Sequence, residues 1–469
     1  MRETGRFLQY GRLRKMSGTF LCVFTGVIHA ALFAAAAAVH SAGSPMNAAA
    51  MEHALKAELL DIWYPASVDS VRGGFLSDFS RDWKPAGPQH KMLVTQARHV
   101  WTASCAALFF QDAHFRKIAE HGFCFLRDRM RDPDFGGFYM LRNRGGGALP
   151  GPRGDIKSTY GNAFAIYALA AYYRLSGDGA ALSLAAQTFE WLENHAHDPD
   201  FGGYFDALTR EGKWLYLSGH GDDMQGYIGR AAWKDQNTSI HLMEAFAALY
   251  RVWPDSLLRE RLLEMFALVR DTMVTERGCL TLFFERDWTP VSFPGPEKTG
   301  AAADHVSFGH DVETAYLLLE AAHALGIPAG GKTLAIARKM VDHALAHGWD
   351  HETGGFFDSG RLTGPPDSLV ILNDAKIWWV QAEGLNALLL MSGLFPDDPE
   401  YADAARRQWA YIDRYLIDHE FGGWYEEGLD RSPEQVRAPK ATMWKVNYHN
   451  ARALMNGIRM LRSECELFR

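Results

Sequence analysis

Two hydrophobic patterns alternate along the chain from Met51 onward. In segments such as 158–176, apolar residues occupy nearly every position. In segments such as 179–197, they form a single stripe at helical spacing, made of Leu182, Ala185, Phe189 and Leu192. A helix that is apolar on every side must be covered on every side, so the first pattern predicts inner helices and the second predicts outer helices.

The whole chain can be divided in this way. Inner helices are expected at residues 94–110, 158–176, 237–252, 310–325, 376–391 and 448–461. Outer helices are expected at residues 51–63, 114–131, 179–197, 255–273, 332–347 and 399–418.

A short phrase recurs between each outer helix and the next inner helix. It consists of an acidic residue, three variable positions, two glycines and an aromatic residue. Paired glycines adopt backbone angles that other residues disfavour, and the acidic side chain can cap the turn, so each phrase predicts a tight connection. The phrase begins at Asp69, Asp132, Asp198, Asp350 and Asp418, and a degenerate copy lies at residues 276–279.

Six such units predict an all-α fold, an (α/α)6 barrel in which six inner helices surround a central cavity and six outer helices cover them. The helix at 51–63 lacks a preceding partner and the helix at 448–461 lacks a following one, so these two would close the ring. Closure would let residues 46–469 form a single catalytic domain. An open superhelical array is the alternative, but such arrays usually end in polar capping repeats.

Composition and charge narrow the class of function. Hydrophobic residues make up 48% of the chain and charged residues 22%, as in a globular protein. The formal charge is −8, so no overall positive field would hold a nucleic acid. The five cysteines show neither CxxC nor zinc-ligand spacing, so neither a disulfide framework nor a metal site is expected.

The first 45 residues differ from the rest. Basic residues up to Lys15 precede an apolar stretch over 19–39, which is followed by small residues. This pattern is typical of a signal sequence or a membrane anchor. Either one predicts an exported or anchored protein that meets a membrane only through this segment. A translation start at Met46 is the third interpretation and predicts a cytoplasmic protein.

The turns bring the first residues of all inner helices to one face, where we expect a pocket. Aromatic rings suit the apolar faces of a sugar, and amides and carboxylates suit its hydroxyl groups. The sequence therefore favours a small carbohydrate as the ligand. The candidate residues are Arg98, Trp101, Tyr160, Asn237, His241, Glu244, His310, Glu313, Trp378, Trp379, Glu383, Trp444, Tyr448 and His449.

Three histidines on this face are candidates for proton transfer. His241 lies three residues before Glu244 and His310 lies three residues before Glu313, so each pair shares one helical face. A carboxylate that accepts one ring N–H leaves the other ring nitrogen free to take or give a proton. His310 and His449 also lie at expected helix starts, where the helix dipole disfavours imidazolium. The alternative for each histidine is a capping or packing role.

One motif points to a different chemistry. Residues 326–333 match GxxxxGK[ST], the pattern of a phosphate-binding loop, which follows a strand and opens a helix. The preceding segment, 314–325, has a helical pattern instead. We interpret the motif as a turn between an inner and an outer helix.

Several segments, taken in order, resemble the N-acylglucosamine 2-epimerase superfamily, and within it the cellobiose 2-epimerases. The resemblance runs from Met51 to Leu461. The segments are QARHVWTAS around Arg98, STYGNAFAIYALAAYY around Tyr160, NTSIHLMEAFAALYRVW around His241, SFGHDVETAYLL around His310, IWWVQAE around Trp379 and MWKVNYHNARAL around His449. One departure is Ser239, because that family often has a histidine two residues before the one that matches His241.

The resemblance implies an (α/α)6 barrel that interconverts a glucose-type and a mannose-type reducing end without metal or nicotinamide. It implies that His310 and His449 act as the acid/base pair, while His241 helps ring opening or stabilises the intermediate. Arg98 and Glu313 would support the charge and the tautomer. The residues that would hold the sugar are Tyr160, Asn237, Trp379 and Trp444. We expect a monomer or a homodimer, and Ser239 leaves the preferred sugar and any isomerase side activity open.

Two other functions stay open at this point. A glycoside hydrolase on the same barrel would need paired carboxylates, and a sugar-binding toroid without catalysis would not need His310 or His449. The candidate carboxylates for a hydrolase are Asp222, Asp223, Asp304 and Asp311.

Overall fold

The structure is a computed structural model, and it describes residues 46–151, 155–215, 233–292, 305–328, 330–364, 368–465 and 467. Residues Ser44–Arg469 form one compact unit. The predicted signal or anchor segment, residues 1–45, lies outside the described residues. Among the helices that are described, none is both long and apolar enough to cross a lipid bilayer.

Within the described residues, the expected inner and outer helices are all present. The inner helices are α4 (Leu93–Phe110), α6 (Thr159–Ser176), α8 (Gln236–Tyr250), α10 (Phe308–Leu325), α12 (Trp378–Leu394) and α14 (Tyr448–Leu461). The outer helices are α2 (Ala48–Leu55), which η1 (Lys56–Leu60) and α3 (Asp61–Ser67) continue, α5 (Ala113–Phe125), α7 (Gly179–His195), α9 (Ser256–Leu268), α11 (Gly331–Gly348) and α13 (Pro399–Tyr411). Three of the outer helices end in a π-helical turn: η2 (Leu126–Met130), η4 (Val269–Met273) and η5 (Ile412–Leu416).

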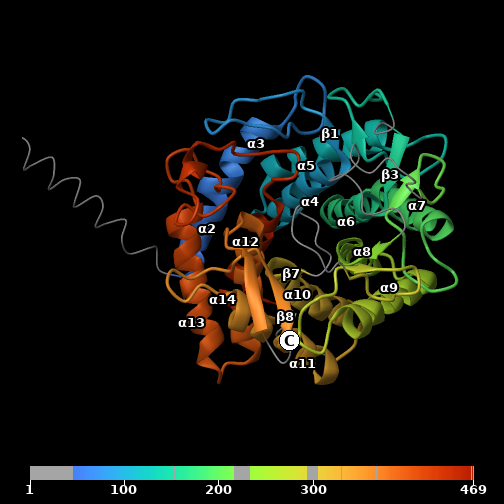
Figure 1. Cartoon of the computed structure of the whole chain (residues 1–469). Coiled ribbons are helices and arrows are strands. Elements are labelled where there is room, and N and C mark those ends of the chain that lie inside the picture. The colour runs from blue at the N-terminus through green and yellow to red at the C-terminus, as the bar shows by residue number, and fades with distance from the viewer. Residues whose placement is uncertain are drawn as a thin grey trace, which may run out of the picture. The chain divides into compact units, whose positions relative to one another are not determined.

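The inner helices form a closed ring. Each packs against the next in chain order, and the last, α14, packs against both α4 and α2. Figure 1 shows the colour running from blue α2 to red α14 as the chain passes once around the ring. The structure therefore confirms the (α/α)6 barrel and the predicted pairing of the first and last helices.

The local sequence explains why one helix of each pair is inner and the other outer. In α6, every residue from Thr159 to Tyr172 is buried, whereas α7 buries a stripe that includes Ala181, Leu184, Ala185, Phe189 and Leu192. Gly177 ends α6 in the left-handed region, with φ 71°, and the carboxylate of Asp178 accepts a hydrogen bond from the N–H of Ala180 to start α7. The connection is short because a stop signal and a start signal are adjacent.

Short antiparallel strands, which the sequence did not predict, link neighbouring units. Strands of two or three residues are too short to show alternation. The pairs are β1 (Lys91–Met92) with β2 (Leu141–Arg142), β3 (Ile156–Ser158) with β4 (Ala207–Thr209), and β5 (Lys234–Asp235) with β6 (Phe283–Phe284). A three-stranded sheet is formed by β7 (His305–Ser307), β8 (Ser359–Gly364) and β9 (Ser368–Asn373). A short 3₁₀ helix, η6 (Pro433–Arg437), precedes α14.

The paired-glycine turns have the predicted conformation. In the second turn, Gly136 and Gly137 have φ 72° and 62°, and the Oδ1 of Asp132 accepts a hydrogen bond from the N–H of Asp134 at 3.0 Å. A bridge between the residue before the aspartate and the residue after the glycines closes each turn. The degenerate fourth turn is one residue shorter, between Val274 and Leu280, and Thr275 takes the place of the aspartate.

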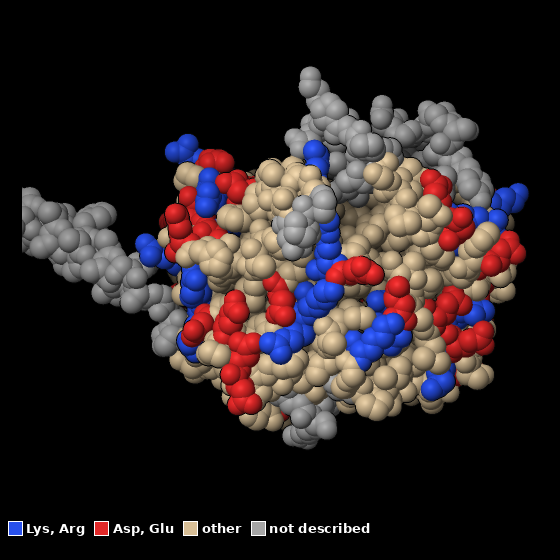
Figure 2. All heavy atoms as spheres, turned by 60° about the horizontal axis from the view of Figure 1, so that its bottom comes forward, with Lys and Arg blue, Asp and Glu red and all other residues tan. Residues whose placement is uncertain are grey.

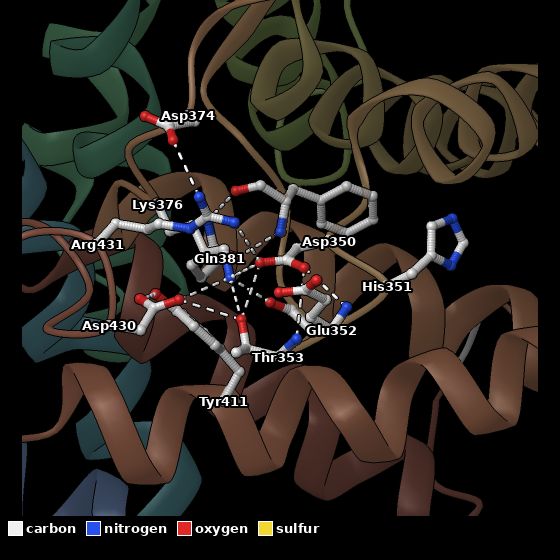
Figure 3. A network of polar contacts seen from close by, with 12 residues as sticks. Asp350, His351, Glu352, Thr353, Asp374, Lys376, Gln381, Tyr411, Asp430 and Arg431 are labelled. Carbon is white, nitrogen blue, oxygen red and sulfur yellow. Dashed lines mark hydrogen bonds and ion pairs between the residues drawn. The ribbon is translucent and has the colours of Figure 1, made fainter.

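Each turn aspartate is buried between a lysine and an arginine. The carboxylate of Asp132 lies 3.1 Å from the Nζ of Lys157 and 2.8 Å from the Nε of Arg210, and the Asp132 and Lys157 side chains are fully buried. Figure 3 shows the same arrangement at Asp350, where Asp430 also contacts the lysine. The five sets are Asp69 with Lys91 and Arg144, Asp132 with Lys157 and Arg210, Asp198 with Lys234 and Arg286, Asp350 with Lys376 and Arg431, and Asp418 with Lys440 and Arg81.

These charge triads join successive units. In four of them the lysine stands two residues before the inner helix, while the arginine comes from the following unit. Arg81, from the first unit, contacts Asp418 of the last unit, so the same interaction closes the ring. In the fourth unit, Thr275 and Val306 replace the aspartate and the lysine together. A buried lysine without its carboxylate would strongly destabilise the fold. Because both residues are replaced together, no unpaired lysine charge is buried in this unit.

Charges on the surface are mixed. Figure 2 shows basic and acidic side chains interspersed over the face in view. No broad basic surface is seen on that face.

The triads give a first prediction. Asp132→Asn should lower the free energy of unfolding by about 3–5 kcal/mol, because it removes the negative charge next to a buried lysine. Asp134→Asn is the matched control, since the Asp134 side chain is 66% exposed and contacts one terminal nitrogen, Nη2, of Arg210. Its effect should stay below about 1 kcal/mol. Urea unfolding followed by circular dichroism measures both, and equal midpoints would contradict the proposed role of the triad.

Candidate active site

Equivalent positions of the inner helices form successive tiers along the bore of the barrel. Residues two, six and nine of a helix share one face, because they are separated by four and three positions. The first tier holds Val94, Tyr160, Asn237, Gly309, Trp379 and His449. The second holds Arg98, Phe164, His241, Glu313, Glu383 and Ala453, and the third holds Trp101, Tyr167, Glu244, Tyr316, Asn386 and Asn456. The residues to which the family resemblance assigns a role lie in the first two tiers, except His310 and Trp444. Of the other candidates, Glu383 is in the second tier, Trp101 and Glu244 are in the third, and Trp378 and Tyr448 are the first residues of α12 and α14.

Trp379 lies beside two of the predicted catalytic histidines. Its ring centroid is 4.8 Å from that of His310 and 5.8 Å from that of His449. Gly309 makes room for it, since a Cβ at that position would come within 2.6 Å of the Trp379 ring. The tryptophan is half-buried, so part of its ring stays open to a ligand.

Tyr160 lies on another side of the same tier. The Nη2 of Arg98 donates a hydrogen bond of 3.0 Å to its hydroxyl. The Tyr160 ring lies 5.3 Å from His241 and 6.4 Å from Trp444. Burial raises the pKa of Tyr160 to about 12, so the phenol stays neutral and can donate or accept hydrogen bonds.

All three histidines are held through Nδ1. If these histidines transfer protons, Nε2 is the ring nitrogen that would do so in each. The three pairs are His241 with the Oε2 of Glu244 at 2.8 Å, His449 with the Oε1 of Glu383 at 2.7 Å, and His310 with the Oγ of Ser307 at 2.9 Å. The expected pair of His241 and Glu244 is confirmed. The expected pair of His310 and Glu313 is wrong, because Ser307 holds His310 while Glu313 faces an arginine.

That arginine, Arg452, is the main feature that the sequence analysis missed. It is 2% exposed, and its guanidinium contacts three carboxylates from three inner helices: Glu244, Glu313 and Glu383. The hydroxyl of Tyr448 joins the same cluster and donates a 2.7 Å hydrogen bond to Glu244. The available signal was a basic residue four positions after Tyr448 on a predicted inner helix.

Arg452 lies next to the side chains that could hold a metal ion. Among the described residues, one set could hold a metal ion: donor atoms of Glu313, Glu383 and His449 lie within 4.8 Å of one another. The guanidinium of Arg452 already contacts both of these carboxylates and supplies a positive charge there. The expectation of an enzyme without metal or cofactor stays a prediction.

Burial and this cluster set the protonation states. Burial lowers the pKa of His310 to about 4 and the pKa of His449 well below its ordinary value. Burial would raise the pKa of Glu244, but Arg452 and the hydrogen bond with His241 outweigh it and lower that pKa to about 2. Burial raises the pKa of Glu383. The two imidazoles are therefore neutral near pH 7.

A separate row of polar residues serves the turns. The fourth residues of four inner helices are Gln96, Asn162, Asp311 and Gln381, and each accepts a hydrogen bond from a backbone N–H of a turn. Asp311, a carboxylate considered for hydrolysis, thus holds the N–H of Leu280. Ser239 occupies the equivalent position of α8 and bonds the backbone of Asp235, so this departure from the family pattern lies in the turn-facing row. The other hydrolase candidates, Asp222, Asp223 and Asp304, lie outside the described residues.

Residues 326–333, which match the pattern of a phosphate-binding loop, do not follow a strand as such a loop does. Helix α10 precedes them, Gly326 ends that helix with φ 69°, and α11 begins at Gly331. This confirms the predicted turn between an inner and an outer helix.

Some buried polar atoms of the site have no partner in the described part of the chain. They are the Nε of Arg98, the Oε2 of Glu313 and the Oε2 of Glu383. Buried polar groups in folded proteins are nearly always hydrogen-bonded, so unpaired ones in a bore indicate capacity for a polar ligand.

Comparison with known proteins identifies similar chains over nearly the whole described region. The family described as N-acylglucosamine 2-epimerase (GlcNAc 2-epimerase) matches residues 73–453. A cellobiose 2-epimerase of Bacteroides fragilis is 29% identical over 408 residues, which cover 86% of this chain and 96% of that one. A D-mannose isomerase of Marinomonas mediterranea is 25% identical over 85% of this chain and 94% of its own. The solved structure of cellobiose 2-epimerase from Spirochaeta thermophila superposes with a TM-score of 0.75 at 30% identity, covering 89% of this chain and 96% of that one.

The Arg452 cluster gives a second prediction. Arg452→Gln should lower the free energy of unfolding by about 3–5 kcal/mol, because it leaves three buried carboxylates without their cation. Arg414→Gln, at an exposed position of an outer helix, is the control and should change stability by less than about 0.5 kcal/mol. Thermal unfolding of the two variants gives the comparison. A stable, unshifted Arg452→Gln protein would show that the cluster does not depend on the guanidinium.

Proposed function

Since the chain belongs to the N-acylglucosamine 2-epimerase family and is a carbohydrate isomerase, we propose that it inverts C2 of a glucose-type or mannose-type reducing sugar. The reaction would pass through an enediolate and need neither metal nor nicotinamide. Residues 46–469 would form the single catalytic domain, with the N-terminal segment outside it. The relatives named cellobiose 2-epimerase support a disaccharide with a glucose reducing end as the first substrate to test.

The observation that carries this proposal is the placement of two neutral imidazoles beside one aromatic platform. His310 and His449 come from different inner helices, α10 and α14, and both lie next to Trp379. Each is anchored by Nδ1, so each can present Nε2 to a sugar on the platform. Two proton-transfer groups from opposite sides are what inversion of a single carbon requires.

The chemical step balances as a proton exchange. After the ring opens, one imidazole takes the proton from C2, the C–H electron pair forms the C1–C2 double bond, and the carbonyl electrons move to O1. The second imidazole, protonated for that turnover, returns a proton to the opposite face of C2. The negative enediolate favours that imidazolium, although burial disfavours it in the empty site.

Two groups are suited to hold the developing charge on O1. Arg98 has an unpartnered Nε within the described residues, and its stacking over Phe164 at 4.5 Å fixes the guanidinium. His241 is oriented by Glu244, which accepts its Nδ1–H, so Nε2 can accept a proton during ring opening and then donate from the imidazolium to O1. Preorganised donors of this kind contribute a few kcal/mol each to transition-state stabilisation.

The remaining predicted residues would bind the sugar. Trp379 and Trp444 are half-buried rings that can stack on its apolar faces. Tyr160 and Asn237 offer hydrogen bonds to its hydroxyls from the first tier. Glu313 contacts Arg452 through Oε1, which also lies 3.8 Å from the Nδ1 of His449, and its Oε2 is available for a sugar hydroxyl group.

The function is tested by following C2 of candidate sugars in D₂O. The protein is incubated with cellobiose, glucose, mannose and N-acetylglucosamine in buffer containing EDTA, and NMR reports deuterium at C2 and the appearance of the epimer. We expect both with at least one sugar. Release of monosaccharide from cellobiose without exchange would support a hydrolase instead, and absence of exchange from every sugar would contradict the proposal.

Single substitutions test the acid/base pair. His310→Ala and His449→Ala should each lower the exchange rate by at least about 100-fold, since each removes one proton-transfer group. His114→Ala is the matched control, because His114 is exposed on the outer helix α5. Circular dichroism checks that the variants are folded. Substantial exchange in both folded variants would remove these residues from the mechanism.

The pH dependence is a further prediction. The pKa of His310 is about 4, so its neutral form persists below the ordinary value of about 6.5. The proposed step needs one neutral and one protonated imidazole, and the protonated form is the minor one above about pH 4, so kcat/KM should rise as the pH falls from about 7.5 to about 5.5. Unfolded histidines bind protons near about pH 6.5, so the stability from buried neutral histidines is full above that pH and falls as pH drops toward 4.

Thermal scans at each pH define the window in which the protein is folded. Within that window, a kcat/KM that falls below about pH 6.5 would contradict the prediction and show that the histidines titrate as they do in water.

A further inference from the structure

The barrel has a second concave site at the opposite end of the bore. A pocket of about 270 Å³ lies among the third-tier residues and the C-terminal ends of the inner helices. Trp101, Tyr167 and Tyr316 line its inner part, and the helix ends form its rim. The histidines of the proposed active site are at the beginnings of these helices, so the two sites open from different ends.

Three arginines from three inner helices meet at this pocket. Arg174 is in the last turn of α6, Arg251 directly follows α8, and Arg459 is near the end of α14. In the part of the chain that the structure describes, none of the three forms an ion pair. Cations at helix C-termini interact favourably with the helix dipole, which helps hold the guanidiniums at the rim.

The charge balance of the pocket favours an anion. Glu244, at its inner end, already neutralises Arg452, which leaves Glu320 and Glu464 against the three rim arginines. The lining therefore carries an excess positive charge in a concave site. Arginine is suited to such a role because its planar guanidinium binds phosphate or carboxylate through two parallel hydrogen bonds.

A buried donor points to the same conclusion. Arg452 lines the inner end of the pocket and is 2% exposed. Its Nη atoms contact the carboxylates of the active-site cluster, but its Nε finds no acceptor among the described residues. An unpaired buried donor of a charged group is costly, so an acceptor at this position would be stabilising.

We propose that this pocket binds a small dianion, a phosphate or a dicarboxylate, at the end of the barrel opposite the sugar. The volume is just below the usual range for ligand sites, roughly 300–1,000 Å³, which excludes a large cofactor. The dianion would be held by Arg174, Arg251 and Arg459 at the rim and would accept from Arg452 at the inner end. The dianion would be linked to His241 through two side chains, first Arg452 and then Glu244.

Titration calorimetry at constant ionic strength tests the proposal with two probes, inorganic phosphate and succinate. We expect saturable binding of at least one probe below ~10 mM. Binding of phosphate alone assigns the site to phosphate compounds, and binding of succinate alone assigns it to dicarboxylates. Absence of saturable binding by either probe would overturn the proposal.

Substitutions then place the site. The double variant Arg174→Ala/Arg251→Ala should weaken binding at least about tenfold, and both positions are exposed, so the fold should be retained. Arg116→Ala, an exposed arginine on α5 away from the pocket, should leave binding unchanged. Equal affinity in the double variant and the control would show that the anion binds elsewhere and would overturn the assignment.

Discussion

Burial of a lysine ammonium group next to an aspartate is the constraint on which the rest of this barrel depends. An ammonium group removed from water is strongly destabilising unless a carboxylate contacts it, so each buried lysine fixes the position of one turn aspartate. The arginine from the next unit completes the contact and sets the distance between neighbouring units. The contact between Arg81 of the first unit and Asp418 of the last unit joins the two ends of the ring in the same way.

A ring held in this way frees its inner surface for chemistry. The turn-facing row, with Gln96, Asn162 and Gln381, repeats around the barrel and serves only the fold. The bore-facing tiers do not repeat, since equivalent positions carry Tyr160, Trp379 and other unlike side chains. Six similar units therefore supply six different groups at one depth, which is how a symmetric scaffold can build an asymmetric site for a sugar.

Arg452 connects the functional parts of the molecule. Its guanidinium contacts the carboxylates that orient His241 and His449, so the two imidazoles depend on a common cation. Without that charge, three carboxyl groups would be buried together with no cation beside them, which is strongly destabilising. The same side chain forms the inner end of the second pocket, so an anion there would act on the carboxylates through their shared partner.

The sequence by itself determined the helices, their inner or outer character and the turns, and it suggested most residues of the proposed site, because hydrophobic spacing and glycine pairs are local signals. It placed Tyr160, Trp379 and His449 on one face correctly. Only the tertiary structure decided that Ser307 rather than Glu313 holds His310, and that one arginine meets three carboxylates. These contacts join residues from different helices, and their geometry follows from how the ring packs, which local spacing does not encode.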